Sequence, residues 1–437
     1  MYFLYSSLLA AVLVLGSPYW LYQLIRHGKY RRGLPQRLGF VPEHFRNSAK
    51  PSIWIHAVSV GEVLAIGELV PALRDQRPDL RVVISTTTDT GQKLASTRFG
   101  AENVFYFPFD FAFAVRSWIG ALHPGLIVIA ETEFWPNLLR VGNQSGARIA
   151  IVNARISDRS LPGYRRWKNF LTPILGGVDI FLAQTAEDAR RLVEIGAAAN
   201  RVLVGGNLKY DVPPPPPPPI VDQLRTAFAA SGAGPILVCG STVEGNPETE
   251  EALLTAAFQN VAASYPAAVM LLAPRHPERF ESVDAMLGQS KIKFLRRSQW
   301  NDDSGDSLNG AVLLIDSIGE LSSLYAVADI AFVGGSLVPC GGHNIIEPAQ
   351  HGVPILIGPH TENFRAVVEL FQSRDAVRVV NSSELPSAFL ELLGDAALRR
   401  ELGRRASETL ASQRGATKLT LQQLQKLLAP PLEAKPA

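Results

Sequence analysis

From Pro51 onward, short segments rich in β-branched residues alternate with longer segments of helical periodicity. This alternation is typical of βαβ units, in which helices cover a parallel sheet. The candidate strands before residue 213 are Ser52–His56, Arg81–Ser85, Asn103–Phe107, Leu126–Ala130, Arg148–Val152, Asp179–Ala183 and Arg201–Val204. Those after residue 219 are Ile236–Cys239, Ala267–Ala273, Ala311–Ile315, Asp329–Val333 and Pro354–Ile357. The sequence therefore predicts an α/β protein with parallel sheets.

A run of prolines, Pro213–Pro219, interrupts this alternation. Such a run adopts extended polyproline II, and at ~3.1 Å per residue it makes a semi-rigid spacer of roughly 20 Å. The length of 437 residues also exceeds what one hydrophobic core usually supports. We expect an N-terminal segment (residues 1–25), two Rossmann-like domains (26–212 and 220–437) and a linker (213–219).

The first 25 residues contain no charged side chain and are about long enough to cross the hydrocarbon core of a membrane as a helix. The positive-inside rule places the basic residues that follow, and the rest of the chain, in the cytoplasm. These residues are Arg26, Lys29, Arg31, Arg32 and Arg37. A cleavable signal peptide would have the opposite order. We expect a single-pass anchor; a helix lying in the membrane interface is the alternative, because Pro18 and Tyr19–Trp20 fall within the run.

The bulk composition indicates neither disorder nor a nucleic-acid-binding surface, because the formal net charge is only +2 and 47% of residues are hydrophobic. Cys239 and Cys340 each lie in an apolar or glycine-rich stretch. They offer neither metal-ligand spacing nor a disulfide framework, which favours a reducing compartment. No Asp-x-Asp sequence occurs, so no metal is expected.

Glu62 follows the first candidate strand, within the segment His56–Glu62. In open parallel sheets, ligands bind at the carboxyl ends of the strands. A carboxylate held there on a rigid element suits a general base that removes a proton from an acceptor hydroxyl. The same residues also fit a capping box, with Ser59 at the N-cap and Glu62 reaching back to its amide. Spacing alone leaves both interpretations open.

Charged residues also follow two other strands of the first half. Glu131 and Glu133 come directly after the strand ending at Ala130, and Pro136 suits the start of the next helix. Lys209 precedes the proline run and is suited to neutralise a phosphate or a substrate carboxylate. The alternatives are a solvated acidic loop and an ordinary surface lysine.

In the second half, Pro274 and Arg275 end a strand, and the guanidinium is suited to clamp a phosphate. The segment Ile318–Glu320 follows another strand, where Gly319 permits close backbone approach at a helix N-terminus. Here too a capping box, from Ser317 to Glu320, is the alternative.

Glycine-rich segments at Gly334–Ser336 and Gly341–Glu347 enter a further helix. They offer backbone amides to a phosphate, and Glu347 is suited to bind ribose hydroxyls. A tight turn with a solvent-facing glutamate is the alternative.

Seven ordered motifs together resemble those of the 3-deoxy-D-manno-octulosonic acid (Kdo) transferases, which add Kdo to the lipid A precursor. The motifs are HAVSVGE, ETEFWPN, NARISDRS, GNLKYD, PRHPERF, FVGGSLVPCGGHNIIEPAQHG and GPHTENF. The resemblance implies a two-domain GT-B glycosyltransferase fold facing a cleft, CMP-Kdo as donor, lipid IVA as acceptor and inversion at the anomeric carbon. It also implies an enzyme of lipopolysaccharide biosynthesis at the cytoplasmic side of a bacterial inner membrane.

The resemblance further implies roles for individual residues. Glu62 would be the base, and Glu131 and Lys209 would stabilise the transition state. CMP would be bound by Pro274, Arg275, Ile318, Gly319, Glu320, Asn344, Ile345, Ile346 and Glu347.

Some positions depart from the family pattern. Val243 stands where relatives commonly carry His, Asn246–Pro247 interrupts the acids that follow, and Ile345 replaces a common Pro.

Two other classes of protein remain possible. A UDP-sugar transferase or epimerase would share the fold but would prefer another nucleotide. A non-catalytic membrane scaffold would need neither the base nor the phosphate clamp.

Overall fold

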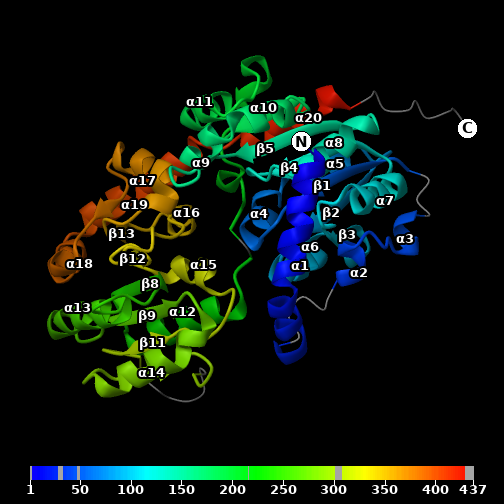
Figure 1. The fold of residues 1–437 in the computed structure, drawn as a ribbon. Coiled ribbons are helices and arrows are strands. Elements are labelled where there is room, and N and C mark those ends of the chain that lie inside the picture. The colour runs from blue at the N-terminus through cyan, green and yellow to red at the C-terminus, as the bar shows by residue number, and fades with distance from the viewer. Residues whose placement is uncertain (1, 28–32, 47–49, 215, 301–307, 429–437) are drawn as a thin grey trace, which may run out of the picture. The chain divides into compact units, whose positions relative to one another are not determined.

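The structure is a computed structural model that describes residues 2–27, 33–46, 50–214, 216–300 and 308–428 (Figure 1). The chain forms two compact units. The first contains residues 1–212 together with the segment that begins at Gln413, and the second is Pro213–Ser412. Each unit has its own sheet and its own hydrophobic core.

The sheet of the first unit has seven parallel strands in the order β3-β2-β1-β4-β5-β6-β7. Their bounds are β1 Ser52–His56, β2 Arg81–Thr86, β3 Val104–Tyr106, β4 Pro124–Ala130, β5 Arg148–Ala154, β6 Ile180–Ala183 and β7 Val202–Val204. The order reverses direction between β1 and β4. That pair of strands is where an open α/β sheet places its ligand.

Helices cover both faces of this sheet (Figure 1). The α-helices are α1 Tyr2–His27, α2 Leu34–Arg37, α3 Glu43–Arg46, α4 Val60–Ala65, α5 Leu69–Gln76, α6 Asp89–Phe99, α7 Ala112–Leu122, α8 Pro136–Gln144, α9 Leu161–Arg166, α10 Lys168–Leu175, α11 Ala186–Glu194 and α20 Ala416–Leu427. Short 3-10 helices are η1 Ala101–Asn103, η2 Ala199–Arg201 and η3 Leu208–Tyr210. Because side chains alternate along a strand, Trp54 enters the core on one face, whereas Ile53 and Ile55 enter the core on the other.

The sheet of the second unit is also parallel, in the order β10-β11-β9-β8-β12-β13-β14, and reverses between β8 and β12. Its strands are β8 Ile236–Thr242, β9 Val269–Pro274, β10 Phe294–Arg296, β11 Val312–Leu314, β12 Ile330–Val333, β13 Ile355–Ile357 and β14 Arg378–Val379. Its α-helices are α12 Pro219–Ser231, α13 Glu250–Ser264, α14 Phe280–Gln289, α15 Leu321–Leu324, α16 Ile346–Gln350, α17 Arg365–Gln372, α18 Leu385–Gly394 and α19 Ala396–Ala411. The 3-10 helices are η4 Pro277–Arg279, η6 Tyr325–Val327, η7 Glu362–Phe364 and η8 Ser382–Glu384. Every strand expected from the sequence is present, and the prediction of two parallel α/β units is confirmed.

The C-terminal boundary of the second unit differs from the expected one. Residues 220–437 were expected to form one domain, but α20 belongs to the first unit, where it packs against α5. Its Leu421 and Leu424 are buried in the same core as Ile53 and Ile55. The apolar face of α20 therefore completes the first unit. The linker is also shorter than expected, because α12 begins at Pro219, a position where proline favours helix initiation.

Asp211 holds the start of α20 in place. Its carboxylate oxygens accept hydrogen bonds from the amides of Gly415 at 2.7 Å and Thr417 at 2.5 Å. We expect Asp211→Ala to lower the free energy of unfolding by about 1 kcal/mol, the usual loss when a capping acceptor is removed. Thermal denaturation measures the change, and Asp211→Asn, which keeps one acceptor oxygen, should retain most of the stability. Equal stability of the alanine variant and the parent would contradict this capping role.

One side of α1 packs against the first unit. The Asn137 amide donates a hydrogen bond to the Ser6 hydroxyl at 3.1 Å, and the Arg140 guanidinium lies 4.6 Å from the centre of the Tyr2 ring. Tyr5 hydrogen-bonds to the Asp110 carboxylate. Apolar residues on the remainder of the helix are exposed: Phe3, Leu4, Leu8, Val12, Val14 and Leu15. Counting only residues that the structure describes, no helix is both long enough and apolar enough to cross a membrane. The predicted spanning anchor at residues 1–25 is not supported by this finding.

Candidate functional site

The first unit brings three of the predicted residues to the carboxyl ends of its strands. Glu62 lies on α4 after β1, Glu131 directly follows β4, and Lys209 lies on η3 after β7. The helix α4 contacts η3, and the negative charge of Glu131 influences the ionisation of Glu62. The three charged groups therefore form one cluster at the reversal of the strand order.

Glu62 is a buried carboxyl group, with 7% of the residue exposed. Its two oxygens accept hydrogen bonds from the Val58 amide at 2.7 Å and from the Ser59 hydroxyl at 3.0 Å. Burial raises the pKa of Glu62 to about 7, and the charges of Glu131 and Glu133 act in the same direction. The two hydrogen bonds partly oppose this shift. A carboxyl with a pKa near neutrality suits a general base.

The expected capping box around Glu62 is formed only in part. Ser59 is the N-cap of α4, but its side chain accepts no amide hydrogen bond and instead donates to Glu62. Glu62 reaches the amide of Val58 and not that of Ser59. Because the hydroxyl proton is directed at the carboxylate, the pair orients Glu62 more than it caps the helix.

Glu131 and Lys209 form an ion pair, with 3.0 Å between the Glu131 Oε1 and the Lys209 Nζ. Glu131 adopts a left-handed backbone conformation with φ 57°, which is uncommon outside glycine and clusters at functional sites. Burial raises the pKa of the neighbouring Glu133, and the charge of Glu131 adds to the shift. The lysine thus pairs with one of three carboxyl groups, Glu62, Glu131 and Glu133, in which the charge of Glu131 influences the other two.

Asn153 positions Lys209, although it was not singled out from the sequence. It lies at the end of β5 with φ 55°, and its Oδ1 accepts the amide hydrogen of Leu208 at 3.0 Å. This bond fixes the start of η3 and hence the direction of Lys209. The signal available in the sequence was a side-chain amide directly after the expected strand Arg148–Val152, within the motif NARISDRS.

In the second unit, Arg275 lies close to Glu347 and His343. Arg275 is exposed just after β9, and its positive charge lowers the pKa of both neighbours. Burial has the larger effect on each, raising the pKa of Glu347 and lowering that of His343 to about 4. Asn344 donates a hydrogen bond to Glu347 at 3.1 Å. The predicted residues Arg275, Asn344 and Glu347 are therefore brought together.

The remaining residues that were predicted to bind CMP contribute to this region mainly through their backbone and through the shape that they give it. Pro274, Ile345 and Ile346 are buried. Ile318 is 81% exposed, and Gly319 has φ 90°, a conformation that favours glycine. Glu320 is bound by Ser317 and by Arg297, and α15 begins only at Leu321, later than the predicted helix start.

The glycine-rich segment Gly334–Ser336 is already occupied by a protein carboxylate, which corrects the expectation that its amides are open to a phosphate. The fully buried Glu250 accepts the amide hydrogens of Gly335 at 2.6 Å, Ser336 at 2.9 Å and Leu337 at 2.8 Å. It also accepts the amide of Val243 at 3.1 Å. Val243 contributes its backbone here, so the departure from the family's His leaves this contact intact.

No group of three or more His, Cys, Asp or Glu side chains suited to a metal ion occurs among the residues that the structure describes. Cys239 is buried and Cys340 is exposed, and both are free thiols.

Comparison with known proteins identifies the family. A family model for 3-deoxy-D-manno-octulosonic-acid transferase (kdotransferase) matches residues 32–212. A 3-deoxy-D-manno-octulosonic acid transferase of Haemophilus influenzae is 36% identical over 417 residues, covering 94% of this chain and 93% of the relative. The chain belongs to the Kdo transferase family. A second Kdo transferase, from Bordetella pertussis, is 35% identical and covers 94% of this chain and 95% of its own length.

Solved structures agree with the fold of this Kdo transferase. A glycosyltransferase from Rickettsia africae matches with a TM-score of 0.57 and 13% identity, over 87% of this chain and 98% of that one. UDP-GlcNAc 2-epimerase from Neisseria meningitidis matches with a TM-score of 0.57 and 12% identity, over 86% and 100%. At such identities the likeness concerns the fold alone, and it agrees with the predicted pair of α/β domains resembling GT-B glycosyltransferases.

Proposed function

We propose that this Kdo transferase transfers Kdo from CMP-Kdo to the lipid A precursor lipid IVA, with inversion at the anomeric carbon. The observation that carries the proposal is Glu62, a buried carboxyl with a pKa of about 7 beside the Glu131–Lys209 ion pair. At neutral pH about half of such a group is ionised, so it can accept a proton and still remain reactive.

The proposed reaction is a single displacement. Glu62 removes the proton of an acceptor hydroxyl, and the oxygen attacks the anomeric carbon of Kdo while the bond from that carbon to the CMP phosphate breaks. CMP leaves with the bonding electron pair. Attack on the face opposite the leaving group inverts the configuration.

Glu131 and Lys209 stabilise the transition state in this proposal. Lys209 is a fixed cation suited to the carboxylate of the sugar acid, and the ion pair with Glu131 holds its ammonium in place. Glu131 also places negative charge where the sugar ring becomes positive.

The CMP moiety is proposed to bind to the second unit. Arg275 is an exposed fork of donors suited to the phosphate, and the partly buried Glu347 is suited to the ribose hydroxyls. The backbone segments at Ile318–Glu320 and Asn344–Ile346 complete the set.

We expect CMP to stabilise the protein selectively. At a hundredfold excess over its dissociation constant, a ligand that binds only the folded state adds about 2.7 kcal/mol to the free energy of unfolding. Thermal shift measurements should show this for CMP and much less for UMP or ADP, and Arg275→Ala should remove most of it. Equal shifts for the three nucleotides would reject the donor assignment.

We further propose that α1 attaches the protein to the cytoplasmic face of the inner membrane. Its exposed residues Phe3, Leu4, Leu8, Val12 and Leu15 support this, because the opposite side of the helix packs on the protein. Fractionation tests the location: apolar attachment resists a high-salt wash and is reversed by detergent.

Incubation of the purified protein with CMP-Kdo and lipid IVA tests the complete function, with mass spectrometry of the lipid as readout. A mass increase of one or more Kdo units is the expected result. An unchanged lipid, with donor binding intact, would overturn the proposed transfer.

A further inference from the structure

Three cations and one aromatic side chain are exposed along the segment from Arg159 to Lys168, which contains α9 and the start of α10. Arg159, Arg166 and Lys168 are exposed, and Trp167 between them has 63% of its surface exposed. We call these four residues the α9–α10 cationic surface. Within the described part of the chain, the side chains of its three cations form no ion pair or hydrogen bond. By contrast, the adjacent Arg165 pairs with Glu194. The three charges are therefore available to a ligand.

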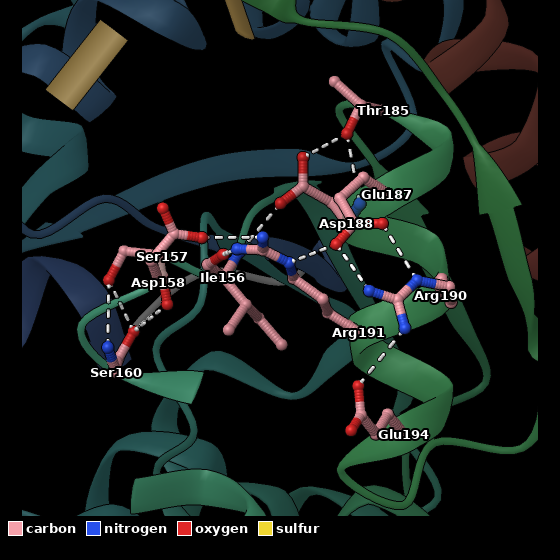
Figure 2. Close-up of polar contacts among 10 residues, drawn as sticks. All are labelled: Ile156, Ser157, Asp158, Ser160, Thr185, Glu187, Asp188, Arg190, Arg191 and Glu194. Carbon is pink, nitrogen blue, oxygen red and sulfur yellow. Dashed lines mark hydrogen bonds and ion pairs between the residues drawn. The ribbon is translucent and has the colours of Figure 1, made fainter. Parts of the chain in front are cut away.

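The loop Ile156–Ser160, which carries Arg159 and leads into α9, is held by hydrogen bonds and ion pairs to α11, as Figure 2 shows. The Arg191 guanidinium, on α11, donates to the Ile156 carbonyl and to the Asp158 carboxylate, both at 2.7 Å. Asp188 accepts the Ile156 amide at 2.9 Å, and the hydroxyls of Ser157 and Ser160 are 2.7 Å apart. A loop held in this way presents Arg159 with less loss of conformational entropy on binding.

The same loop lies against the loop that carries the carboxylates of the candidate active site. The Arg155 amide donates to the Thr132 hydroxyl at 3.1 Å, and the rings of Phe134 and Tyr164 are in edge contact at 5.7 Å. Burial raises the pKa of Tyr164, and the charge of Glu133 adds to the shift. The loop before α9, which carries Arg159, and α9, which carries Arg166, thus contact the Glu131–Phe134 segment.

The carboxyl groups of the candidate active site and the α9–α10 cationic surface have opposite charges. Together they select an acceptor by the distribution of charge along it. A phosphate is repelled by the carboxyl groups of Glu62, Glu131 and Glu133 and attracted by the three cations carried by the adjoining loop, by α9 and by the start of α10. An uncharged hydroxyl is free to approach Glu62. An exposed tryptophan among basic residues suits the boundary between polar head groups and acyl chains.

We propose that the α9–α10 cationic surface binds a phosphate group of the acceptor, a phosphorylated glycolipid, and so directs its hydroxyl toward Glu62. This inference rests on the proposed function. It makes Arg159, Arg166 and Lys168 determinants of acceptor specificity, with Trp167 contacting the lipid beside the head group.

The test is the double variant Arg166→Glu/Lys168→Glu. The matched control is Arg116→Glu/Lys418→Glu, which makes the same change of charge at two exposed cations of the first unit. With the phosphorylated acceptor, KM of the test variant should rise about tenfold or more, as expected for losing a charge-assisted hydrogen bond. Its kcat and the dissociation constant of CMP should stay within a few fold of the parent. The control should resemble the parent throughout.

A chemically dephosphorylated acceptor separates phosphate recognition from general damage. The test variant and the parent should use it equally poorly. Loss of activity by the same factor on both acceptors would overturn the proposal. So would a KM defect that appears only in vesicles of anionic phospholipid and vanishes in neutral detergent micelles, since the surface would then bind the bulk membrane.

Binding without donor distinguishes this proposal from the proposed function. The phosphorylated glycolipid in neutral micelles should change the fluorescence of the parent, less that of Trp167→Phe, and not that of the double variant. If the parent binds in this manner but transfers no Kdo, the reaction assignment fails and the binding surface stands. If transfer occurs and the double variant binds normally, the surface assignment is wrong.

Discussion

Glu62→Gln is expected to lower the rate of Kdo transfer by ~10²–10⁴-fold, the usual contribution of general-base catalysis, without weakening the fold. An amide cannot take up the proton, but it fits the same contacts. Its oxygen can accept from the Val58 amide and its NH2 group can donate to the Ser59 hydroxyl. Steady-state kinetics on the purified variant with saturating donor measures the loss.

The stability of this variant should depend on pH in a defined direction. Because burial raises the folded-state pKa of Glu62 to about 7, above the ordinary value of 4.5, the folded parent holds a proton that the unfolded chain has lost. The parent therefore loses stability as pH rises from about 4.5 to about 7, and Glu62→Gln does not suffer this loss. Thermal denaturation should show the variant gaining on the parent between pH 5 and pH 8.

The same group governs the pH dependence of the parent enzyme. Since the base works only when deprotonated, kcat/KM should rise with pH and level off above an apparent pKa of about 7. Ser59→Ala is the control: it keeps the base and removes one hydrogen bond to the ionised form. Transfer by Glu62→Gln at near the parent rate would assign Glu62 a structural role only.

Glu250→Ala is expected to have the largest effect on stability. The substitution leaves four amides without their acceptor: the buried ones of Val243, Gly335 and Ser336 and the partly buried one of Leu337. At about 1–3 kcal/mol for each unsatisfied buried group, a loss of about 4 kcal/mol or more is expected in the second unit. CMP binding should fall with it, because the loop Gly334–Leu337 leads into the segment that carries Asn344 and Glu347.

Hydrogen exchange locates the effect of Glu250→Ala. The amides of Gly335, Ser336 and Leu337 should exchange much faster, whereas those of the first sheet should be unchanged. Glu250→Gln, which keeps one acceptor oxygen, should lie between the parent and the alanine variant. Glu248→Ala, at an exposed position of the same segment, is the matched control and should have little effect. Unchanged protection in Glu250→Ala would refute the carboxylate's role.

The strands could be predicted from the sequence where they are buried on both faces, because such strands are continuous apolar runs. β1 and β4 are of this kind, and their bounds were found to within two residues. β10 and β14 were missed. They are edge strands of three and two residues. Their partly exposed arginines, Arg296 and Arg378, interrupt the alternation of apolar and polar residues by which a strand is recognised.

The candidate site was predictable in position but not in its internal contacts. A carboxylate after β1 and another after β4 must lie close together once the sheet is parallel. The partners of Glu250 could not be foreseen, because the amide of Gly335 lies 85 residues further along the chain. The same limit hid the bond from Leu208 to Asn153, which orients Lys209.

The return of α20 to the first unit has a consequence for synthesis on the ribosome. Residues 1–212 leave the ribosome first, yet the core around Ile53 and Ile55 lacks Leu421 and Leu424 until nearly the whole chain has been made. The core of the first unit therefore stays incomplete, with an apolar surface exposed, while the second unit is translated and folds. Synthesis at roughly 5–20 residues per second makes that interval about 10–40 s for the intervening two hundred residues. A nascent chain stalled before Ala416 should accordingly bind chaperones through its N-terminal half.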